Sequence, residues 1–258
     1  MFVATTSSEG TDRRSLNLQD NGNALVSAVA AANPNTIVVA ATPGALLTPW
    51  AKEIKALLVN FMPGQEGGNA IADLLFGDVN PSGKLPLTFP NVDNEVNFTK
   101  EMYPGTFPDH GNPSQQEASY SEKLLVGYRW YDAHKVAPAF PFGHGLSFTT
   151  FHYSELQSST SAVSLTLTNN GSAGGAEVVQ LYLSFPAAAG EPPQQLKGFQ
   201  KVYLQPGEKA QVTLKLSPRD FSIWSVAAHS WQVVSGAFGV AVGSSSRDHR
   251  LTGTIEVL

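Results

Sequence analysis

The residues with the clearest chemical potential lie near the start of the sequence, where TTSSEGTDRR runs from Thr5 to Arg14. Glu9 lies in the middle of this stretch, a few positions after the apolar residues FVA at 2–4. In α/β sheets, ligands collect where strands end and loops begin, so a carboxyl group on such a loop can face a substrate. Glu9 is therefore a candidate catalytic acid and base, with an ordinary loop carboxylate as the alternative.

For several other polar and aromatic residues, the preferred prediction is a structural role. Asp12 and Arg13 indicate a local ion pair or a contact that braces the loop, and an exposed pair of this kind contributes about 0–1 kcal/mol to stability. His144, in the stretch FGHG, indicates a packed structural histidine, with a reach into an active site as the alternative. Trp224 and Trp231 indicate packing, with a platform on which a carbohydrate ring stacks as the alternative.

The composition argues against several classes of function. Hydrophobic residues make up 42% of the 258 positions and charged residues 14%, which predicts a folded chain. The net charge is -5 without a basic run, so nucleic acid is not an expected partner, and no apolar stretch approaches the length of a membrane span. Cysteine is absent and the six histidines lack metal-binding spacing, so neither a metal nor a cofactor is predicted.

Two sequons for N-glycosylation occur, at Asn97 (NFT) and Asn170 (NGS). Two sequons are close to the number expected by chance, so they support secretion only weakly. The first residues, MFVATTSSEG, lack the basic and long apolar regions of a signal peptide. From these features we expect either a cytosolic protein or a natural start that is missing from the sequence.

Residues 1–90 are predicted to form part of an α/β domain, because strand and helix patterns alternate along them. The apolar run TIVVAA at 36–41 is typical of a strand buried on both faces of a parallel sheet, and ALLVNF at 56–61 predicts a second buried strand. Asn21 or Asn23 is the expected cap of one helix, and Thr48 that of another. The remaining predicted elements are a strand at 2–5, a helix within 21–35 that stops at Asn33-Pro34, helices at 49–54 and 64–77, and an extended piece at 84–90.

The rest of the chain changes character twice. Residues 91–150 are rich in Pro, Gly, Asn and aromatic residues without a clear period, so they predict a connector packed over both domains, with parts that line a pocket as the alternative. Residues 151–258 show two-residue alternation between turns, which predicts an antiparallel β-sandwich. Its strand-like segments lie at 162–169, 176–185, 208–217, 230–236, 237–244 and 251–258.

Several long motifs follow one another in a recognisable order. They are SSEGTDR at 7–13, PGQEGGNAIADLLFGDVNPSGKLPLTFP at 63–90, VGYRWYD at 126–132 and FPFGHGLSFTTFHYSEL at 140–156. These motifs resemble the C-terminal portion of a family 3 glycoside hydrolase of the β-glucosidase type. QLKGFQKVYLQPGEKAQVTLKL at 195–216 and SPRDFSIW at 217–224 resemble the fibronectin type III-like domain of its three-domain members. The resemblance covers essentially the whole chain.

The resemblance implies a partial α/β sandwich domain followed by a fibronectin type III-like β-sandwich. It also implies an extracellular retaining glycosidase that acts on a β-linked oligosaccharide or glucoside. In such enzymes a TIM-like barrel supplies the aspartate nucleophile and most sugar-binding residues, and the α/β sandwich domain supplies the acid/base glutamate. Glu9 aligns with that glutamate in the SGEG-type motif, with Ser8 where many members have glycine. No aspartate of this chain matches the nucleophile motif, so we expect the 258 residues to lack the barrel.

Three hypotheses about activity follow. A chain with one half of the catalytic pair is expected to show little or no glycosidase activity alone. The alternative is a non-catalytic module that binds carbohydrate or docks on a barrel from another chain, and a third possibility is a fragment without a function of its own. Because the leading strands are missing, we also expect the strand at 2–5 or TIVVAA to present an unpaired apolar edge that promotes self-association. Sugar specificity is expected to be set mainly in the barrel.

Overall fold

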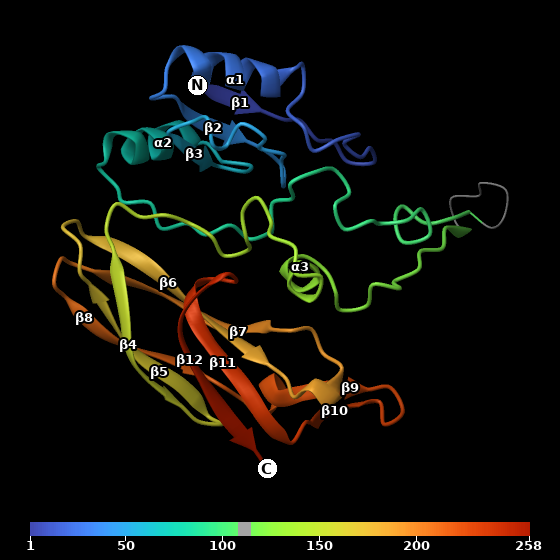
Figure 1. Ribbon diagram of the computed structural model, residues 1–258. Helices are drawn as coiled ribbons and strands as arrows, with labels where there is room; N and C mark the ends of the chain where they lie inside the picture. The colour runs from blue at the N-terminus through green and yellow to red at the C-terminus, as the bar shows by residue number, and fades with distance from the viewer. Residues whose placement is uncertain (108–114) are drawn as a thin grey trace.

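The structure is a computed structural model that describes residues 1–107 and 115–258 of the chain. Figure 1 shows an α/β layer at the top, an irregular green connector in the middle and a β-sandwich below. Residues 108–114, within the predicted connector, lie outside the described residues. An α/β layer followed by an antiparallel sandwich confirms the predicted fold class.

Three parallel strands form the sheet of the α/β layer, in the order β1-β2-β3. Val39 in the central strand pairs with Phe2 on one side and Leu58 on the other, which fixes the register. Helix α1 lies against the sheet, and α2 follows β3 along the chain, as Figure 1 shows. The elements are β1 (Phe2–Ala4), α1 (Gly22–Ala32), β2 (Ile37–Ala41), β3 (Ala56–Val59) and α2 (Gly67–Phe76).

The burial of these strands agrees with the prediction for β2 and differs from it for β3. β2 is the central strand, with Val38, Val39 and Ala40 buried, as its apolar sequence predicted. β3 is only partly buried because it lies at one edge of the sheet. The unpaired edge on the other side belongs to β1, where Phe2 is 70% exposed, and not to TIVVAA. Self-association through this edge stays a prediction.

The predicted helix at 49–54 is wrong, because these residues form consecutive turns. The amide of Ala51 donates to the carbonyl of Thr48, and that of Glu53 donates to Trp50, so each bond spans three residues. Trp50 is fully buried, and its indole N–H donates to Asn23 Oδ1 at 2.9 Å. Anchoring the indole in the core therefore fixes a path that a regular helix would not follow.

The ends of α1 and α2 follow the turn chemistry of the sequence. Asn21 precedes α1 with φ at 61° and makes no side-chain capping bond, so it starts the helix through its left-handed backbone conformation. Asn33 ends α1, and its amide donates to the carbonyl of Val29. Gly77 ends α2 with φ at 85°, a conformation that glycine adopts without a steric penalty.

Among its described residues, the connector contains the short helix α3 (Tyr128–Ala133) and is otherwise mostly irregular. An isolated bridge between Phe89 and Phe140 joins its end to the α/β layer, where Phe89 belongs to the core. That core also contains residues from α1, from β2, and from the segments before α1 and before β3, namely Leu18, Val26, Val38, Ala40, Leu46 and Trp50. The described part of the connector thus shares its core with the layer.

The sandwich consists of a four-stranded sheet in the order β12-β11-β6-β7, a three-stranded sheet in the order β4-β5-β8, and a β9–β10 hairpin. Its core contains alternating residues of both sheets, such as Val163, Leu165 and Leu167. The strands are β4 (Phe151–Ser158), β5 (Ala162–Asn169), β6 (Gly175–Ser184), β7 (Gln195–Leu204), β8 (Lys209–Lys215), β9 (Ser222–Ser225), β10 (Ser230–Val233), β11 (Gly236–Ser245) and β12 (Asp248–Val257). Two 3₁₀ turns, η2 (Ala187–Ala189) and η3 (Pro218–Phe221), interrupt the connections.

The alternating pattern identified six of these strands and left out β4, β7 and β9. An irregularity in β4 between Ser154 and Gln157 interrupts its two-residue period. β7 lies at the edge of its sheet and alternates poorly, and β9 has only four residues directly after η3. Each missed strand therefore lacks the long alternation on which the prediction rests.

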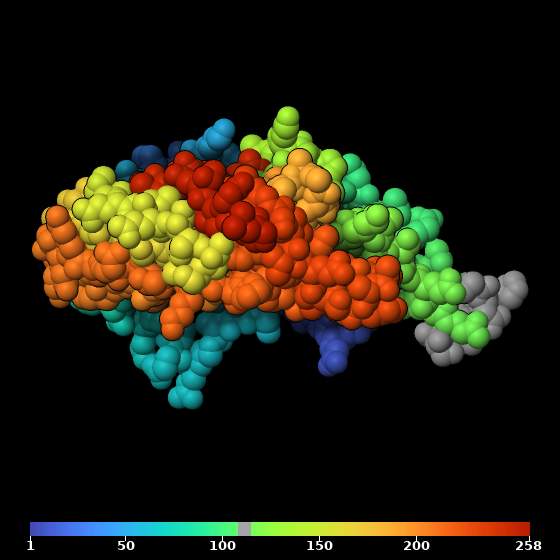
Figure 2. Space-filling view, turned by 90° about the horizontal axis from the view of Figure 1, so that it is seen from below, coloured from blue at the N-terminus to red at the C-terminus, as the bar shows by residue number. Residues whose placement is uncertain are grey.

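The exposure of α2 and the character of the helices complete the description. Figure 2 shows the segment around α2, in teal, projecting beyond the sandwich, in agreement with the 85% exposure of Phe76. Across residues 1–107 and 115–258, the helices are all too short or too polar to span a membrane.

Candidate active site

Glu9 lies at the tip of a loop that begins where β1 ends. The amide of Thr5 donates to the carbonyl of Ala41 at 3.0 Å and so extends the pairing of β1 with β2. Ser8 and Thr11 form an isolated antiparallel bridge that closes a tight turn, and Gly10 in this turn has φ at 77°. Glu9 is exposed on the turn, so its carboxyl group is accessible from outside the domain.

Two sets of hydrogen bonds hold the ends of this loop. At one end, Thr6 exchanges side-chain hydrogen bonds with Gln19. At the other end, the Asp93 carboxylate accepts the amide of Leu16 at 2.8 Å and the hydroxyl of Ser15 at 2.6 Å. Asp93 belongs to the connector, so a distant segment fixes the base of the Glu9 loop.

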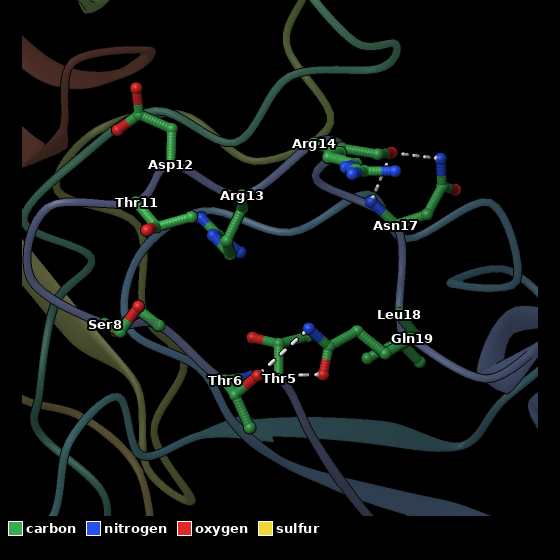
Figure 3. A pocket seen from close by; sticks show the side chains of 12 residues that line it. Thr5, Thr6, Ser8, Thr11, Asp12, Arg13, Arg14, Asn17, Leu18 and Gln19 are labelled. Carbon is green, nitrogen blue, oxygen red and sulfur yellow. Dashed lines mark hydrogen bonds between the residues drawn. The ribbon is translucent and has the colours of Figure 1, made fainter.

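Asp12 and Arg13 contact different neighbours. Arg13 Nη2 donates to the carbonyl of Ala45 at 3.0 Å, which ties the loop to the segment after β2. The ion pairs among the described residues do not include Asp12 with Arg13, and Figure 3 shows the two side chains pointing in different directions. Asp12 instead lies near the Tyr103 hydroxyl, and its carboxylate is the main reason why the pKa of Tyr103 is raised. A role of the two residues in bracing the loop stays a prediction.

A cavity of about 560 Å³, lined mostly by residues with polar side chains, lies beside the loop (Figure 3). Its volume falls in the range of small-ligand sites, and hydroxyl, amide and guanidinium groups on its walls suit a ligand rich in hydroxyl groups. Asp12 is the one carboxylate in its lining, and Glu9 lies outside the lining at the turn. The lining residues are Thr5, Thr6, Ser7, Ser8, Thr11, Asp12, Arg13, Arg14, Ser15, Asn17, Leu18 and Gln19.

His144 lies in a different part of the molecule, where the connector meets the sandwich. Its backbone carbonyl accepts the amide of Leu85 at 2.8 Å, and its ring packs against Phe140 with centroids 5.6 Å apart. Burial lowers the pKa of His144, and the nearby Lys84 ammonium lowers it further. His144 is absent from the lining of the cavity beside Glu9.

The two tryptophans of the sandwich face each other across the β9–β10 hairpin. Trp224 and Trp231 pair in register, with ring centroids 5.4 Å apart, and are 47% and 45% exposed. The Arg219 guanidinium lies over the Trp231 ring. Mutual packing of the rings therefore leaves about half of each side chain accessible to solvent.

Asp93 and Tyr103 are the loop contacts that sequence reasoning missed. Both lie in the connector, and neither has a local motif that links it to residues 12–16. These two residues meet residues 12–16 only when the chain folds back on itself. The only hint in the sequence was the dense aromatic content of the connector, which predicted that it packs on something. Across residues 1–107 and 115–258, no cluster of His, Asp and Glu has the arrangement of a metal site.

The sequence matches two known domain families. Residues 1–148 match the glycosyl hydrolase family 3 C-terminal domain, and residues 177–246 match the fibronectin type III-like domain. The chain therefore belongs to glycoside hydrolase family 3. Its two parts correspond to the C-terminal region of β-glucosidases of this family.

Curated relatives and solved structures agree with this assignment. Probable beta-glucosidase G of Aspergillus flavus is 39% identical over 96% of this chain, and probable beta-glucosidase L of Aspergillus fumigatus is 40% identical over the whole chain. The chain spans about a third of the length of these relatives, 34% and 38% respectively. It also resembles the crystal structure of DesR, a beta-glucosidase from Streptomyces venezuelae in complex with D-glucose, with a TM-score of 0.93, 41% identity and coverage of 100% of this chain and 33% of that one.

Proposed function

We propose that this chain is the acid/base-bearing part of a retaining β-glucosidase and that Glu9 is the acid/base residue. The observation that carries the proposal is the match of residues 1–148 to the family 3 C-terminal domain, in which Glu9 lies on the loop directly after β1. Support also comes from the relatives that align with almost the whole chain, which are named as probable β-glucosidases. The exposed position of Glu9 fits a carboxyl group that acts on a sugar held by another part of the enzyme.

The proposed reaction needs two carboxyl groups about 5–5.5 Å apart, on either side of the glycosidic bond. A nucleophilic carboxylate from the barrel attacks the anomeric carbon while protonated Glu9 gives its proton to the departing oxygen. A covalent glycosyl-enzyme forms and the aglycone leaves. Glu9, now a carboxylate, then removes a proton from water as the water attacks the anomeric carbon, which releases the sugar and restores both carboxyl groups.

The loop contacts assign supporting roles to neighbouring residues. Asp93 and Arg13 hold the base and the flank of the loop, so they would limit how far Glu9 moves relative to β1. A near-attack geometry depends on such positioning, because an error of about 1 Å can cost roughly 10²-fold in rate. The hydroxyl-lined cavity beside the loop offers hydrogen bonds to sugar hydroxyls or to the aglycone.

We also infer that the whole protein works outside the cell, on β-linked oligosaccharides or glucosides. Both sequons lie at exposed positions, Asn97 in a turn and Asn170 just after β5, which supports this location. Self-association or docking on a barrel in trans would use the unpaired edge of β1.

A chimera tests the proposed function directly. The corresponding C-terminal third of the Streptomyces venezuelae enzyme, which is 41% identical, would be replaced by residues 1–258 of this chain. We expect the chimera to hydrolyse an aryl β-glucoside, whereas the isolated chain does so at a rate lower by orders of magnitude. A folded chimera that binds glucose but shows no turnover would contradict the proposal.

A further inference from the structure

Helix α3 of the connector is attached to the β-sandwich through polar side chains. The Asp132 carboxylate lies 2.7 Å from Arg247 Nε and accepts the side-chain amide of Gln194 at 2.7 Å. Its side chain is only 9% exposed, so both bonds are largely shielded from water. The Tyr128 hydroxyl of α3 also accepts the amide of Leu196 on β7 at 2.8 Å. The position of α3 is therefore fixed by the sandwich.

The same helix contacts a tight turn formed by residues 91–95 of the connector. Tyr131 of α3 is buried, and its hydroxyl donates to Glu95 Oε2 at 2.6 Å. The Glu95 carboxylate also accepts the backbone amide of Asn91 at 3.0 Å and its side-chain amide at 2.8 Å, which closes the turn. The Asn91 side chain donates a second bond to the carbonyl of Ala137, a few residues after α3. This turn, called the 91–95 turn below, is therefore held against α3 at two points.

Asp93 projects from the 91–95 turn to the base of the loop that carries Glu9. One carboxylate oxygen accepts the hydroxyl of Ser15 at 2.6 Å and the side-chain amide of Asn17 at 3.3 Å, and the other accepts the amide of Leu16 at 2.8 Å. Donors thus face both oxygens. A carboxylate satisfies them all, whereas an asparagine would direct its NH₂ group against one set of donors.

We propose that Asp93 and Glu95 are positioning residues for Glu9, and that they transmit the position of α3 and the sandwich to the Glu9 loop. The inference rests on the proposed role of Glu9 as the acid/base residue. It gives the sandwich a part in catalysis, although the lining of the cavity beside the loop comes from residues 5–19.

The chemistry of proton transfer explains why the loop needs this support. A general acid must lie within about 2.6–3.2 Å of the atom that it protonates. Glu9 lies on an exposed turn, and Gly10 beside it has φ at 77°, so the placement of the carboxyl group depends on the two ends of the loop. Asp93 fixes the end that leads to α1, where a shift of about 1 Å can cost roughly 10²-fold in rate.

Hydrogen exchange of the full chain, resolved by NMR at single amides, tests the transmission. Tyr131→Phe removes only the hydroxyl that binds Glu95 and keeps the buried ring. The amide of Leu16, which donates to Asp93, should lose protection by about 2–10-fold, as expected for one hydrogen bond. The amide of Asn33, which donates to Val29 in α1, should stay unchanged. Unchanged protection at Leu16, or an equal loss at Asn33, would overturn the inference.

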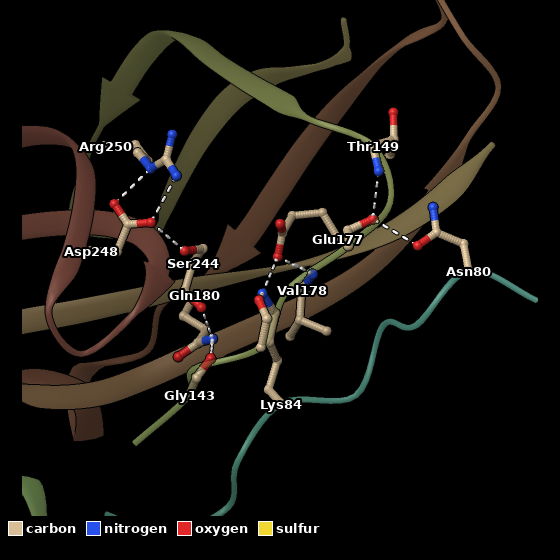
Figure 4. Close-up of polar contacts among 12 residues, drawn as sticks. Asn80, Lys84, Gly143, Thr149, Glu177, Val178, Gln180, Ser244, Asp248 and Arg250 are labelled. Atoms are coloured by element: carbon tan, nitrogen blue, oxygen red, sulfur yellow. Dashed lines mark hydrogen bonds and ion pairs between the residues drawn. The ribbon is translucent and has the colours of Figure 1, made fainter. Parts of the chain in front are cut away.

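Two arginines of the sandwich provide a matched pair of variants. Arg247 pairs with Asp132 of α3, whereas Arg250 pairs with Asp248 within β12 at 2.7 Å, as Figure 4 shows. Each substitution by glutamine removes one cation and one ion pair. Arg247→Gln should lower the protection of the Leu16 amide, and Arg250→Gln should not. Equal effects of the two substitutions, or no effect of either, would overturn the inference.

The chimera described above tests the consequence for catalysis. Asp93→Asn and Tyr131→Phe should each lower kcat/KM on phenyl β-glucoside by about 2–10-fold. They should leave kcat/KM on dinitrophenyl β-glucoside unchanged, because this activated leaving group needs no proton from Glu9. A general structural fault would lower both values.

The same two substrates separate this inference from the proposed function. If Glu9→Gln lowers kcat/KM selectively on phenyl β-glucoside but Asp93→Asn and Tyr131→Phe do not, the positioning role is wrong and the proposed function stands. If even Glu9→Gln lacks this selectivity, the assignment of Glu9 is wrong and the inference falls with it. The exchange measurements need no turnover, so they test the transmission to the loop in an inactive chimera as well.

Discussion

At the scale of single residues, Glu9 illustrates what local sequence can and cannot predict. Its position on a loop after an apolar strand was predictable from the pattern, and the structure places it one turn beyond β1. The contacts that hold this loop were not predictable, because Asp93 and Tyr103 lie more than 75 residues away from it in the sequence. Hydrogen bonds formed by chain reversal leave no periodic signal in either segment.

The exposed sequons give a prediction at the residue scale. When the chain is secreted from a eukaryotic host, Asn97 and Asn170 should both carry glycans, because both lie on exposed backbone next to turns. Intact-mass spectrometry of Asn97→Gln and Asn170→Gln should show the loss of one glycan each. Asn80, which precedes proline, is the internal control and should stay unmodified. A chain that leaves the host without glycans at either site would refute this prediction.

At the scale of elements, predictions succeeded where turn residues mark the end of a helix. They failed where a contact with a distant residue fixes the path of the chain. Gly77 marked the end of α2 because few other residues adopt its backbone conformation. The turns at 49–54 were mistaken for a helix because the local pattern contains no sign that Trp50 is anchored to Asn23. Local chemistry thus predicted helix ends, whereas the path of a segment pinned to the core depended on residues elsewhere.

One glycine inside α2 and the glycine that follows its last residue provide a matched pair of substitutions. Gly77→Ala should destabilise the chain by about 1 kcal/mol, because a Cβ is strained at φ of 85°. Gly68→Ala should stabilise it by about 0.5–1 kcal/mol, because Gly68 is helical and an added Cβ meets nothing within 4 Å. Urea denaturation measures both differences in the free energy of unfolding. Equal effects of the two substitutions would show that backbone conformation does not control this helix end.

At the scale of the whole molecule, the order of an α/β layer, a connector and a β-sandwich was predictable because each part has its own hydrophobic period. The way the parts are attached was not, because it depends on buried polar pairs between segments without periodicity. Lys84 with Glu177 and Asp132 with Arg247 form such pairs, at 2.8 Å and 2.7 Å. The first pair ties the segment after α2 directly to β6, and the second ties the connector to the sandwich.

The Lys84–Glu177 pair gives a prediction at this scale. Lys84→Met should destabilise the chain by about 3–5 kcal/mol, because it leaves the Glu177 carboxylate buried without its partner. Adding Glu177→Leu should recover much of this loss. Arg250→Gln breaks an ion pair whose side chains are 48% and 43% exposed, so it should cost about 0–1 kcal/mol. If Lys84→Met costs no more than Arg250→Gln in urea denaturation, the attachment of the segment after α2 to β6 does not depend on this buried pair.

The most direct test of the central claim measures Glu9→Gln in the chimera with the Streptomyces venezuelae enzyme. Loss of the acid/base group should lower kcat about 10²–10⁴-fold on an aryl β-glucoside. With an activated aryl leaving group the glycosyl-enzyme should still form, and added azide, which needs no general base, should restore turnover and yield β-glucosyl azide. Unchanged kcat in Glu9→Gln, or lost activity that azide does not restore, would contradict the assignment of Glu9 as the acid/base residue.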